Sequence, residues 1–168
     1  GDSFGTAVAI NSEMIVCAAP LHDLQAPNNG AAYVYVPEGV FWRYDAKVSP
    51  SGLTPHAFYG TSLAIREDEI LAGATGDFVT ATNQGSAYLH AKTPLGWVER
   101  ARFRYPNPAD GEKWGHSVGL SSQTAILGAP FGNSESSPKG LAFVYSGAGD
   151  AWAQGEVRLT AQERQAQS

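Results

Sequence analysis

The side chains best suited to chemistry in this sequence are four histidines and one cysteine. Histidine and cysteine together commonly bind zinc, from ligands spaced a few residues apart. The histidines His22, His56, His90 and His116 are far apart, and no pair has the spacing of an HExxH motif. A single cysteine, Cys17, allows neither an intrachain disulfide nor a Cys/His metal site. Because Cys17 lies in an apolar run, we expect a small buried side chain rather than a reactive thiol.

The segment His116-Ser117, with Asp110 shortly before it, has the residue types of a nucleophilic triad. His116, however, stands at a position that two other parts of the chain fill with Thr6 and Thr61. A polar residue that recurs at one strand position favours a residue lining a central channel over a catalytic base. No Gly-x-Ser-x-Gly, P-loop or Gly-x-Gly-x-x-Gly motif occurs in the context that its chemistry needs. We therefore predict no catalytic residues and a protein that is not an enzyme.

Composition indicates a turn-rich folded protein. The chain has 168 residues, a formal net charge of −5, 19 glycines and 43% hydrophobic residues. It is too apolar and too weakly charged for a disordered segment, and its glycines lack the triplet period of collagen. No apolar stretch approaches the roughly 18 residues of a membrane span, and the acidic balance argues against nucleic acid or an anionic membrane as the main partner. Arg100, Arg102 and Arg104 alternate along one segment, and we expect them on an outer, solvated strand edge.

Four landmarks recur twice at an interval of 55 residues, with no insertion between the copies. Each copy has an aromatic–glycine pair, a run of small residues, a glycine-led aromatic run and a tryptophan. A fixed period shared by four landmarks indicates a repeat architecture. The landmarks are Phe4-Gly5, Tyr59-Gly60 and Trp114-Gly115; Ala18-Ala19-Pro20, Gly73-Ala74-Thr75 and Gly128-Ala129-Pro130; the runs 30–35, 85–90 and 140–145; and Trp42, Trp97 and Trp152.

Each copy contains four predicted strands, which in the first copy are residues 5–10, 14–19, 31–36 and 42–48. A four-stranded antiparallel unit repeated about every 40–55 residues is typical of a β-propeller blade. We therefore predict an all-β chain of three blades, at approximately residues 1–55, 56–110 and 111–168. The aromatic before each glycine and the three tryptophans should fill the wedges between blades. The first-strand residues expected to face a neighbouring sheet are Val8, Ile10, Leu63, Ile65, Val118 and Leu120.

The order aromatic-Gly, strand, Gly-Ala-Pro and Gly-x-(Ala/Val)-(Tyr/Phe)-Val-Tyr resembles the FG-GAP repeat, best known from the propeller of integrin α-subunits. Phe4-Gly5 with Ala18-Ala19-Pro20 and Trp114-Gly115 with Gly128-Ala129-Pro130 are good copies, and the middle repeat is a variant. The resemblance covers the chain from end to end and implies a propeller at the cell surface or outside the cell. It implies recognition or adhesion as a function only weakly, because propellers host many unrelated activities.

The turns between the first and second strands depart from the family pattern. Many members bind calcium there, in an Asp-x-Asp-x-Asp-Gly type loop whose carboxylates supply oxygen ligands. The corresponding turns, at residues 11–13, 66–69 and 121–124, are shorter and hold too few spaced carboxylates. We therefore predict that the chain binds no calcium, no other metal and no cofactor.

In a propeller, the connections between the second and third strands and between blades emerge on one face, opposite the short turns. Apolar and aromatic residues in these connections predict a contact surface for a protein partner. The predicted partner-binding residues are His22, Asp23, Leu24, Phe78, Val79, Tyr105 and Phe131.

Two alternative functions stay open at this point. The first is lectin-like glycan binding in pockets between blades, with Trp42, Trp97 and Trp152 as stacking platforms. The second is the role of an accessory propeller domain in a larger enzyme, whose chemistry lies in a different domain.

Three blades cannot close a propeller, which needs about four to eight. The blades at the two ends would expose inter-blade aromatic residues to water. Two arrangements would cover them: a head-to-tail homodimer that forms a six-bladed ring, or further blades in a longer chain. We expect the homodimer.

Overall fold

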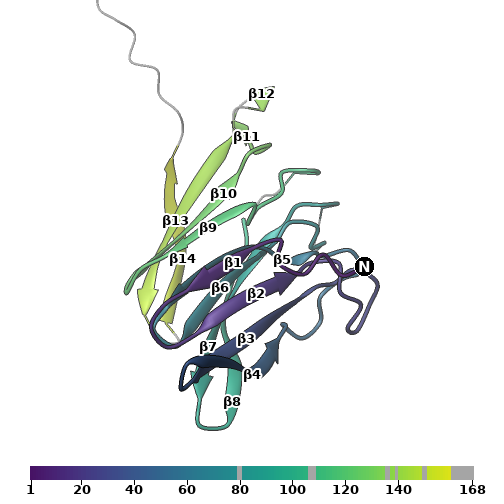
Figure 1. Ribbon diagram of the computed structural model, residues 1–168. Coiled ribbons are helices and arrows are strands. Elements are labelled where there is room, and N and C mark those ends of the chain that lie inside the picture. Colours follow the sequence, from purple (N-terminus) through teal and green to yellow (C-terminus); the bar gives the residue numbers. More distant parts are fainter. Residues whose placement is uncertain (79–80, 106–108, 135–136, 139, 149–150, 160–168) are drawn as a thin grey trace, which may run out of the picture.

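The computed structural model describes residues 1–159 apart from 79–80, 106–108, 135–136, 139 and 149–150. The described residues fold into three antiparallel four-stranded sheets that lie side by side and form no closed ring (Figure 1). None of them is helical, so no helix in this part of the chain could cross a membrane. The all-β, three-bladed fold predicted from the repeat is confirmed.

In each sheet the strands lie in the order in which the chain forms them. Sheet 1 contains β1 (Val8–Ile10), β2 (Ile15–Ala19), β3 (Ala31–Glu38) and β4 (Phe41–Val48). Sheet 2 contains β5 (Tyr59–Arg66), β6 (Glu69–Ala74), β7 (Ser86–Thr93) and β8 (Gly96–Phe103). Sheet 3 contains β9 (Ser117–Leu120), β10 (Thr124–Ala129), β13 (Leu141–Ala148) and β14 (Ala151–Leu159), with the short pair β11 (Asn133–Ser134) and β12 (Ser137–Pro138) between β10 and β13.

The repeat extends to irregularities in the sheets. The pairing of β3 with β4 shifts register between Val34 and Tyr35, and that of β7 with β8 shifts between Leu89 and His90. These two sites are 55 residues apart, so sheets 1 and 2 share the irregularity, whereas sheet 3 has its shift between Tyr145 and Gly147. A bulge adds one residue to one strand and increases the local twist.

The core consists of two interfaces between neighbouring sheets. Side chains alternate across a strand, so Ile70 and Ala72 of β6 face sheet 1 whereas Leu71 faces sheet 3. Central strands of sheet 2 are therefore buried on both sides. The first interface contains Met14, Val16, Ala32, Val34, Val48, Leu53, Ala57, Tyr59, Ile70, Ala72, Ala74 and Tyr88. The second contains Leu71, Ala87, Leu89, Phe103, Trp114, Ala125, Leu127, Ala129, Leu141, Phe143 and Tyr145.

The expected orientation of the first strands is confirmed where a sheet precedes them. Leu63 and Ile65 pack into the first interface, and Val118 and Leu120 pack into the second. Tyr59 and Trp114, the aromatics before the glycines, are fully buried. The corresponding side chains of sheet 1 are exposed, because no sheet lies in front of them; they are Phe4, Val8 and Ile10.

The arginine prediction is wrong for Arg102. Its guanidinium lies 4.6 Å from the centre of the Tyr88 ring and donates to the carbonyl of Ser51 at 3.2 Å. Arg100 and Arg104 are also half-buried. Alternation along β8 places Arg102 beside Tyr88 on the side that faces sheet 1, so the side chain lies across the first interface.

Replacing Trp114 should strongly destabilise the fold. Trp114 is fully buried in the second interface, and its Nε1 donates to Glu112 Oε2 at 2.9 Å. We expect W114A to lower the free energy of unfolding by about 3–5 kcal/mol, because it leaves a cavity and removes this hydrogen bond. Denaturant unfolding measures the change. As a control, L95A alters a side chain that is almost fully exposed and should change stability by less than about 0.5 kcal/mol.

Candidate functional site

In sheets 1 and 2, the connection after the second strand bonds to the start of the next sheet. Gly30 forms a parallel bridge with Tyr59, and Gly85 forms the same bridge with Trp114. The amide of Tyr59 donates to the carbonyl of Asn29 at 3.0 Å, and that of Trp114 donates to the carbonyl of Gln84 at 2.8 Å. We call each of these contacts a blade junction. The blade junctions attach these connections to the next sheet, so the backbone beneath the surface that they form is held in place.

Glycine is required at both junctions. Gly30 has φ +87° and Gly85 has φ +79°, values that side chains rarely allow. A Cβ atom on Gly30 would also overlap the backbone of Tyr59, and one on Gly85 would overlap the backbone of Trp114. The two backbones therefore approach too closely for any side chain.

Left-handed residues continue this arrangement on either side of the junctions. Asn28 and Asn83 have φ of 49° and 50°, and Phe58 and Lys113 both have φ of 56°. The amide of Phe58 donates to the carbonyl of Asn28 at 3.1 Å, and that of Lys113 to the carbonyl of Asn83 at 3.2 Å. A non-glycine residue persists in this region only where its surroundings hold it. These φ angles agree within one degree between positions 55 residues apart, which indicates that the first two connections share one defined conformation.

We call the surface formed by these connections the loop face. It comprises the connections from β2 to β3, from β6 to β7 and from β10 to β13, with those between sheets. In Figure 1 it lies opposite the β1–β2 and β9–β10 turns, on the side where the N-terminus is marked. The sequence predicted this arrangement from the strand order alone.

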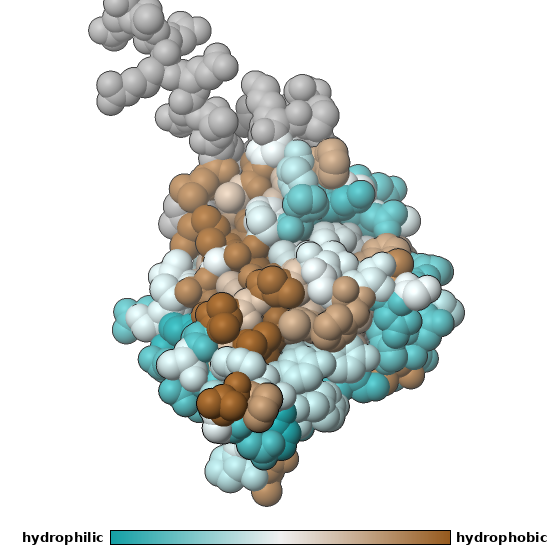
Figure 2. All heavy atoms as spheres, in the orientation of Figure 1, coloured by the Kyte–Doolittle hydropathy of each residue, from teal (hydrophilic) through white to brown (hydrophobic). Residues whose placement is uncertain are grey.

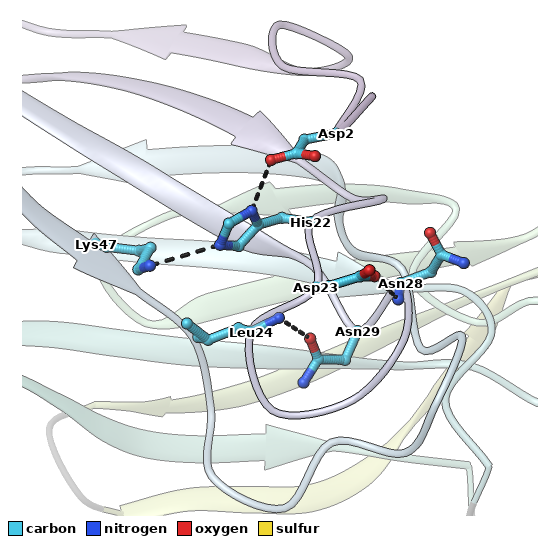
Figure 3. A network of polar contacts seen from close by, with 7 residues as sticks. All are labelled: Asp2, His22, Asp23, Leu24, Asn28, Asn29 and Lys47. Carbon is cyan, nitrogen blue, oxygen red and sulfur yellow. Dashed lines mark hydrogen bonds and ion pairs between the residues drawn. The ribbon is translucent and has the colours of Figure 1, made fainter.

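In the β2–β3 connection, the polar groups are used to hold the loop (Figure 3). His22 Nδ1 lies 2.7 Å from Asp2 Oδ2, and Lys47 Nζ lies 3.5 Å from the other ring nitrogen. Asp23 Oδ1 accepts the amide of Asn28 at 2.7 Å. The predicted site residues His22 and Asp23 therefore brace the connection, and the apolar side chains of Leu21 and Leu24 are exposed to solvent.

The β6–β7 connection is fixed by the buried carboxylate of Asp77. Its Oδ2 accepts the hydroxyls of Ser86 and Tyr88, both at 2.5 Å, and Oδ1 accepts that of Thr54 at 3.3 Å. Burial, followed by the neighbouring Asp77 carboxylate, raises the pKa of Tyr88 to about 12, so the phenol keeps its proton and donates it. Next to this carboxylate the ring of Phe78 is exposed. Val79, also predicted as a site residue, lies outside the described residues.

The third connection presents Phe131, whose exposed ring has Lys113 Nζ 5.3 Å from its centre. The ring of Tyr105, by contrast, does not contribute to the surface of the loop face. Its ring packs 5.1 Å from Trp114 and 4.9 Å from Phe143 in the second interface. Its place directly after β8 suggested a loop residue, but the wedge between sheets 2 and 3 is wide enough to take its ring.

The three tryptophans predicted as alternative stacking platforms have different surroundings. Trp97 packs against the first interface and Trp152 against the second, with its ring 5.4 Å from that of Phe103. Trp42, which has no preceding sheet, is exposed. The three tryptophans do not form one platform. Trp97 and Trp152, which each have a preceding sheet, fill a wedge between sheets as predicted.

One of these wedges is open enough to hold a small molecule. A pocket of about 240 Å³ lies between sheets 1 and 2, with Trp97, His90 and Glu99 on one side and Lys47 on the other. His90 is almost fully buried, and its Nδ1 lies 3.3 Å from the hydroxyl of Tyr59. A pocket between blades beside Trp97 was among the alternatives that the sequence left open, but the part of His90, Glu99 and Lys47 in it was not predicted. Its signal was a histidine at a repeat position that Tyr35 and Tyr145 fill elsewhere. The remaining lining residues are Val48, Ser49, Pro50 and Ser51.

The triad suggested by the sequence is not assembled. Gly115 to Gly119 spells Gly-His-Ser-Val-Gly, but Ser117 begins β9 and a strand, not a helix, follows it. A nucleophile elbow needs a sharp strand-to-helix turn. Asp110 accepts the amide of Thr82 at 2.7 Å, and no hydrogen bond among the described residues joins it to His116 or Ser117.

The turns between the first two strands are closed by their own side chains. Asn11 Oδ1 accepts the amides of Glu13 and Met14, each at 2.9 Å. In the second turn, Arg66 pairs with Glu67 at 3.0 Å and with Glu69 at 2.6 Å. In the part of the chain that the structure describes, no three His, Cys, Asp or Glu side chains are grouped to hold a metal. The absence of calcium stays a prediction.

Comparison with known families agrees with the repeat and the junctions. A family model described as the FG-GAP repeat matches residues 1–35 and 42–90. The chain belongs to the FG-GAP repeat family. No curated protein matches the chain. Members of this family are generally non-enzymatic and are typical of extracellular or surface proteins. Sheet 3 lies beyond the matched residues, and its strand order shows that the FG-GAP architecture continues there.

The structure explains the residues that give the FG-GAP motif its name. The glycine after each aromatic has a positive φ, from +81° to +93°. A Cβ on Gly60 would lie 2.7 Å from the Cβ of Ala18 in the sheet before it. Gly73, in the second Gly-Ala segment, lies so close to Gly115 that a Cβ would overlap its carbonyl. Small residues at these places let consecutive FG-GAP blades approach at the backbone.

The buried histidine should make stability depend on pH. Burial lowers the pKa of His90 to about 4 from an ordinary value of 6.5, so the unfolded chain takes up this proton at a higher pH than the folded chain does. The contribution of neutral His90 to the free energy of unfolding is therefore fully present above about pH 6.5 and is lost as the pH falls toward 4. The expected loss is roughly 3 kcal/mol of unfolding free energy, to be measured by denaturant titration at several pH values.

The variant H90Q should flatten this slope, because glutamine does not titrate. As a control, H116Q replaces an exposed histidine and should leave the slope as it is in the unmodified chain. Equal slopes in H90Q and the unmodified chain would contradict the assignment to His90.

Proposed function

We propose that this FG-GAP chain is a non-enzymatic recognition module that binds a protein partner through its loop face. It needs no metal and no cofactor for this, and it acts outside the cell or at the cell surface. The family supports the general role of a protein-interaction module. The surface itself supports the more specific assignment to the loop face.

One observation carries the proposal: each of the three connections has an exposed apolar side chain, and hydrogen bonds fix the backbone of the first two. Leu24 is 36% exposed, Phe78 50% and Phe131 52%. Hydrogen bonds to Asn29 and Asp77 fix the first two connections from below. A large apolar side chain on a rigid loop loses little entropy on binding and buries much surface, which is how the strongest interface residues act. Polar residues around them, such as Asp23 and Lys113, would form the rim.

The test is a double variant of the loop face compared with a matched double variant elsewhere. F78S/F131S removes two exposed rings from the loop face. V40S/L95S removes two apolar side chains of even greater exposure, 89% and 98%, from the β3–β4 and β7–β8 hairpins. Both should fold, since none of these side chains is buried. The chain and its variants are immobilised, surface and secreted proteins are captured, and the bound amount of each is quantified.

The expected result is a specific set of proteins whose capture falls at least tenfold with F78S/F131S and is unchanged with V40S/L95S. If both variants captured as much protein as the unmodified chain, the loop face would be refuted as the binding surface. Equal losses in both would indicate adhesion to any exposed apolar residue, and would refute it as well.

The pocket between sheets 1 and 2 favours a second candidate function, the binding of a single sugar unit. An indole, a carboxylate, an ammonium group and serine residues line this pocket, whose volume is about 240 Å³. An indole can pack on the apolar face of a sugar ring, and charged groups can bind its hydroxyls. The volume lies below the roughly 300–1,000 Å³ of larger ligand sites, so one ring is the largest unit that fits.

Titration of neutral monosaccharides, followed by tryptophan fluorescence, tests this candidate. We expect E99Q to weaken the response at least tenfold, because it removes a charged acceptor from the pocket. E38Q changes a glutamate outside the pocket, which pairs with Arg43 at 3.4 Å, and should bind sugar normally. A flat response across the whole panel would exclude sugar binding at this pocket.

A further inference from the structure

The outward face of sheet 1 carries the residues that sheets 2 and 3 bury against the sheet before them. Phe4 corresponds to Tyr59 and Trp114, Val8 to Leu63 and Val118, and Ile10 to Ile65 and Leu120. In sheet 1 the three side chains are 55%, 65% and 67% exposed, whereas Tyr59 and Trp114 are fully buried. Figure 2 shows hydrophobic atoms gathered over β1 and beside β9. Most sheet 1 counterparts of residues on the forward side of sheet 2 are uncharged, and the counterpart of Arg102 is the charged Lys47. The uncharged ones are Phe4, Val8, Ile10, Ile15, Cys17, Tyr33, Tyr35, Trp42 and Tyr44.

The outward face of sheet 3 carries the other half of the same contact. In sheet 2, Leu71 and Ala87 are fully buried by sheet 3. Their counterparts in sheet 3, Ile126 and Ala142, line a shallow apolar hollow of about 180 Å³. Ile126 is 37% exposed. Small residues complete the hollow, including Gly119 and Gly128. Sheet 1 therefore presents bulky side chains, and sheet 3 presents a surface that could receive them.

The backbone at the two ends also matches. Gly140 is the third copy of the junction glycine and has φ +71°, like Gly30 and Gly85. Those two are crowded by the aromatic residue of the next sheet, whereas a Cβ on Gly140 would meet nothing but Pro130, at 3.3 Å or more. At the other end, a Cβ on Gly5 would meet no atom within 4 Å. Gly140 and Phe4 thus stand at the two repeat positions that form a blade junction elsewhere in the chain.

We propose that these two faces bind each other between two copies of this chain. Sheet 3 of each copy packs on sheet 1 of the other, and Phe4 forms with Gly140 of the other copy the junction that Tyr59 forms with Gly30. The occupant is a second copy because the chain itself carries both halves of the contact, at the same repeat positions as in its internal interfaces. Two copies give six blades, within the range of about four to eight in which propellers close. The two new contacts are identical and related by a two-fold axis, so the ring has no free face left.

Light scattering of the full chain measures the mass, and two variants identify the faces. The expected mass is twice 17.7 kDa. The variant V8D/I10D places charges on the face of sheet 1, and I126D places one on that of sheet 3. Each should be a folded monomer by itself, with the dimer dissociation constant raised at least 100-fold. The matched control V40D/L95D, on the exposed hairpins, should remain a dimer.

Mixing the two variants distinguishes a head-to-tail contact from other pairings. In a mixed pair, one contact combines both altered faces and the other combines two intact faces. The mixture should therefore form a dimer that contains one copy of each variant, as seen by native mass spectrometry.

Several results would overturn the proposal. A monomer at all concentrations of the unmodified chain would show that a second copy is not the occupant and that these faces serve other blades or partners. An I126D variant that still forms dimers would show that sheet 1 pairs with sheet 1. Assemblies larger than a dimer would show that the contact does not close. Circular dichroism checks that each variant is folded, and charge at Ile10 alone, in I10D, gives a milder variant if V8D/I10D does not fold.

Discussion

The close approach of two backbones at each blade junction is the constraint on which the rest of this structure depends. At Gly30 and Gly85 the chain runs against the first aromatic residue of the next sheet, with no room for a Cβ atom. The hydrogen bonds from Tyr59 to Asn29 and from Trp114 to Gln84 fix this approach. It sets the spacing between sheets, and the spacing determines that a tyrosine or tryptophan fills the wedge. Small residues in the first and second strands follow from the same constraint.

Functional differences between the repeats arise at positions that the junctions leave free. One repeat position holds His22, Asp77 and Gly132. The histidine and the aspartate each supply a different polar side chain that holds the connection, and the glycine supplies none. Tyr35, His90 and Tyr145 occupy another. The histidine is shorter than a tyrosine, so a pocket remains between sheets 1 and 2. Such changes alter a surface without altering the packing of the sheets.

The strands, their order and the side of each first strand could be predicted from the sequence, because period-2 alternation and the 55-residue repeat both report on local structure. Leu63 and Ile65 packed as expected for that reason. Arg102 and Tyr105 could not be placed, because their surroundings come from a different sheet and a long side chain can reach either side. Trp97 was predicted as a stacking platform between blades, but the role of His90 in that pocket was not, because the pocket depends on the volume difference between facing sheets, which no single repeat contains. Of the predicted site, the exposed Leu24, Phe78 and Phe131 lie on the loop face, while His22 and Asp23 hold its backbone.

The junction constraint is tested most directly by the free energy of unfolding of two alanine variants, G85A and G39A. Both glycines have a positive φ, +79° and +65°, but a Cβ on Gly39 would meet no atom within 4 Å whereas one on Gly85 would overlap Trp114. G39A should cost about 1–2 kcal/mol, the ordinary penalty for a left-handed alanine. G85A should cost at least about 2 kcal/mol more, since it also forces sheets 2 and 3 apart. Equal losses in the two variants would contradict the account, because the approach of the backbones would then not hold the blades together.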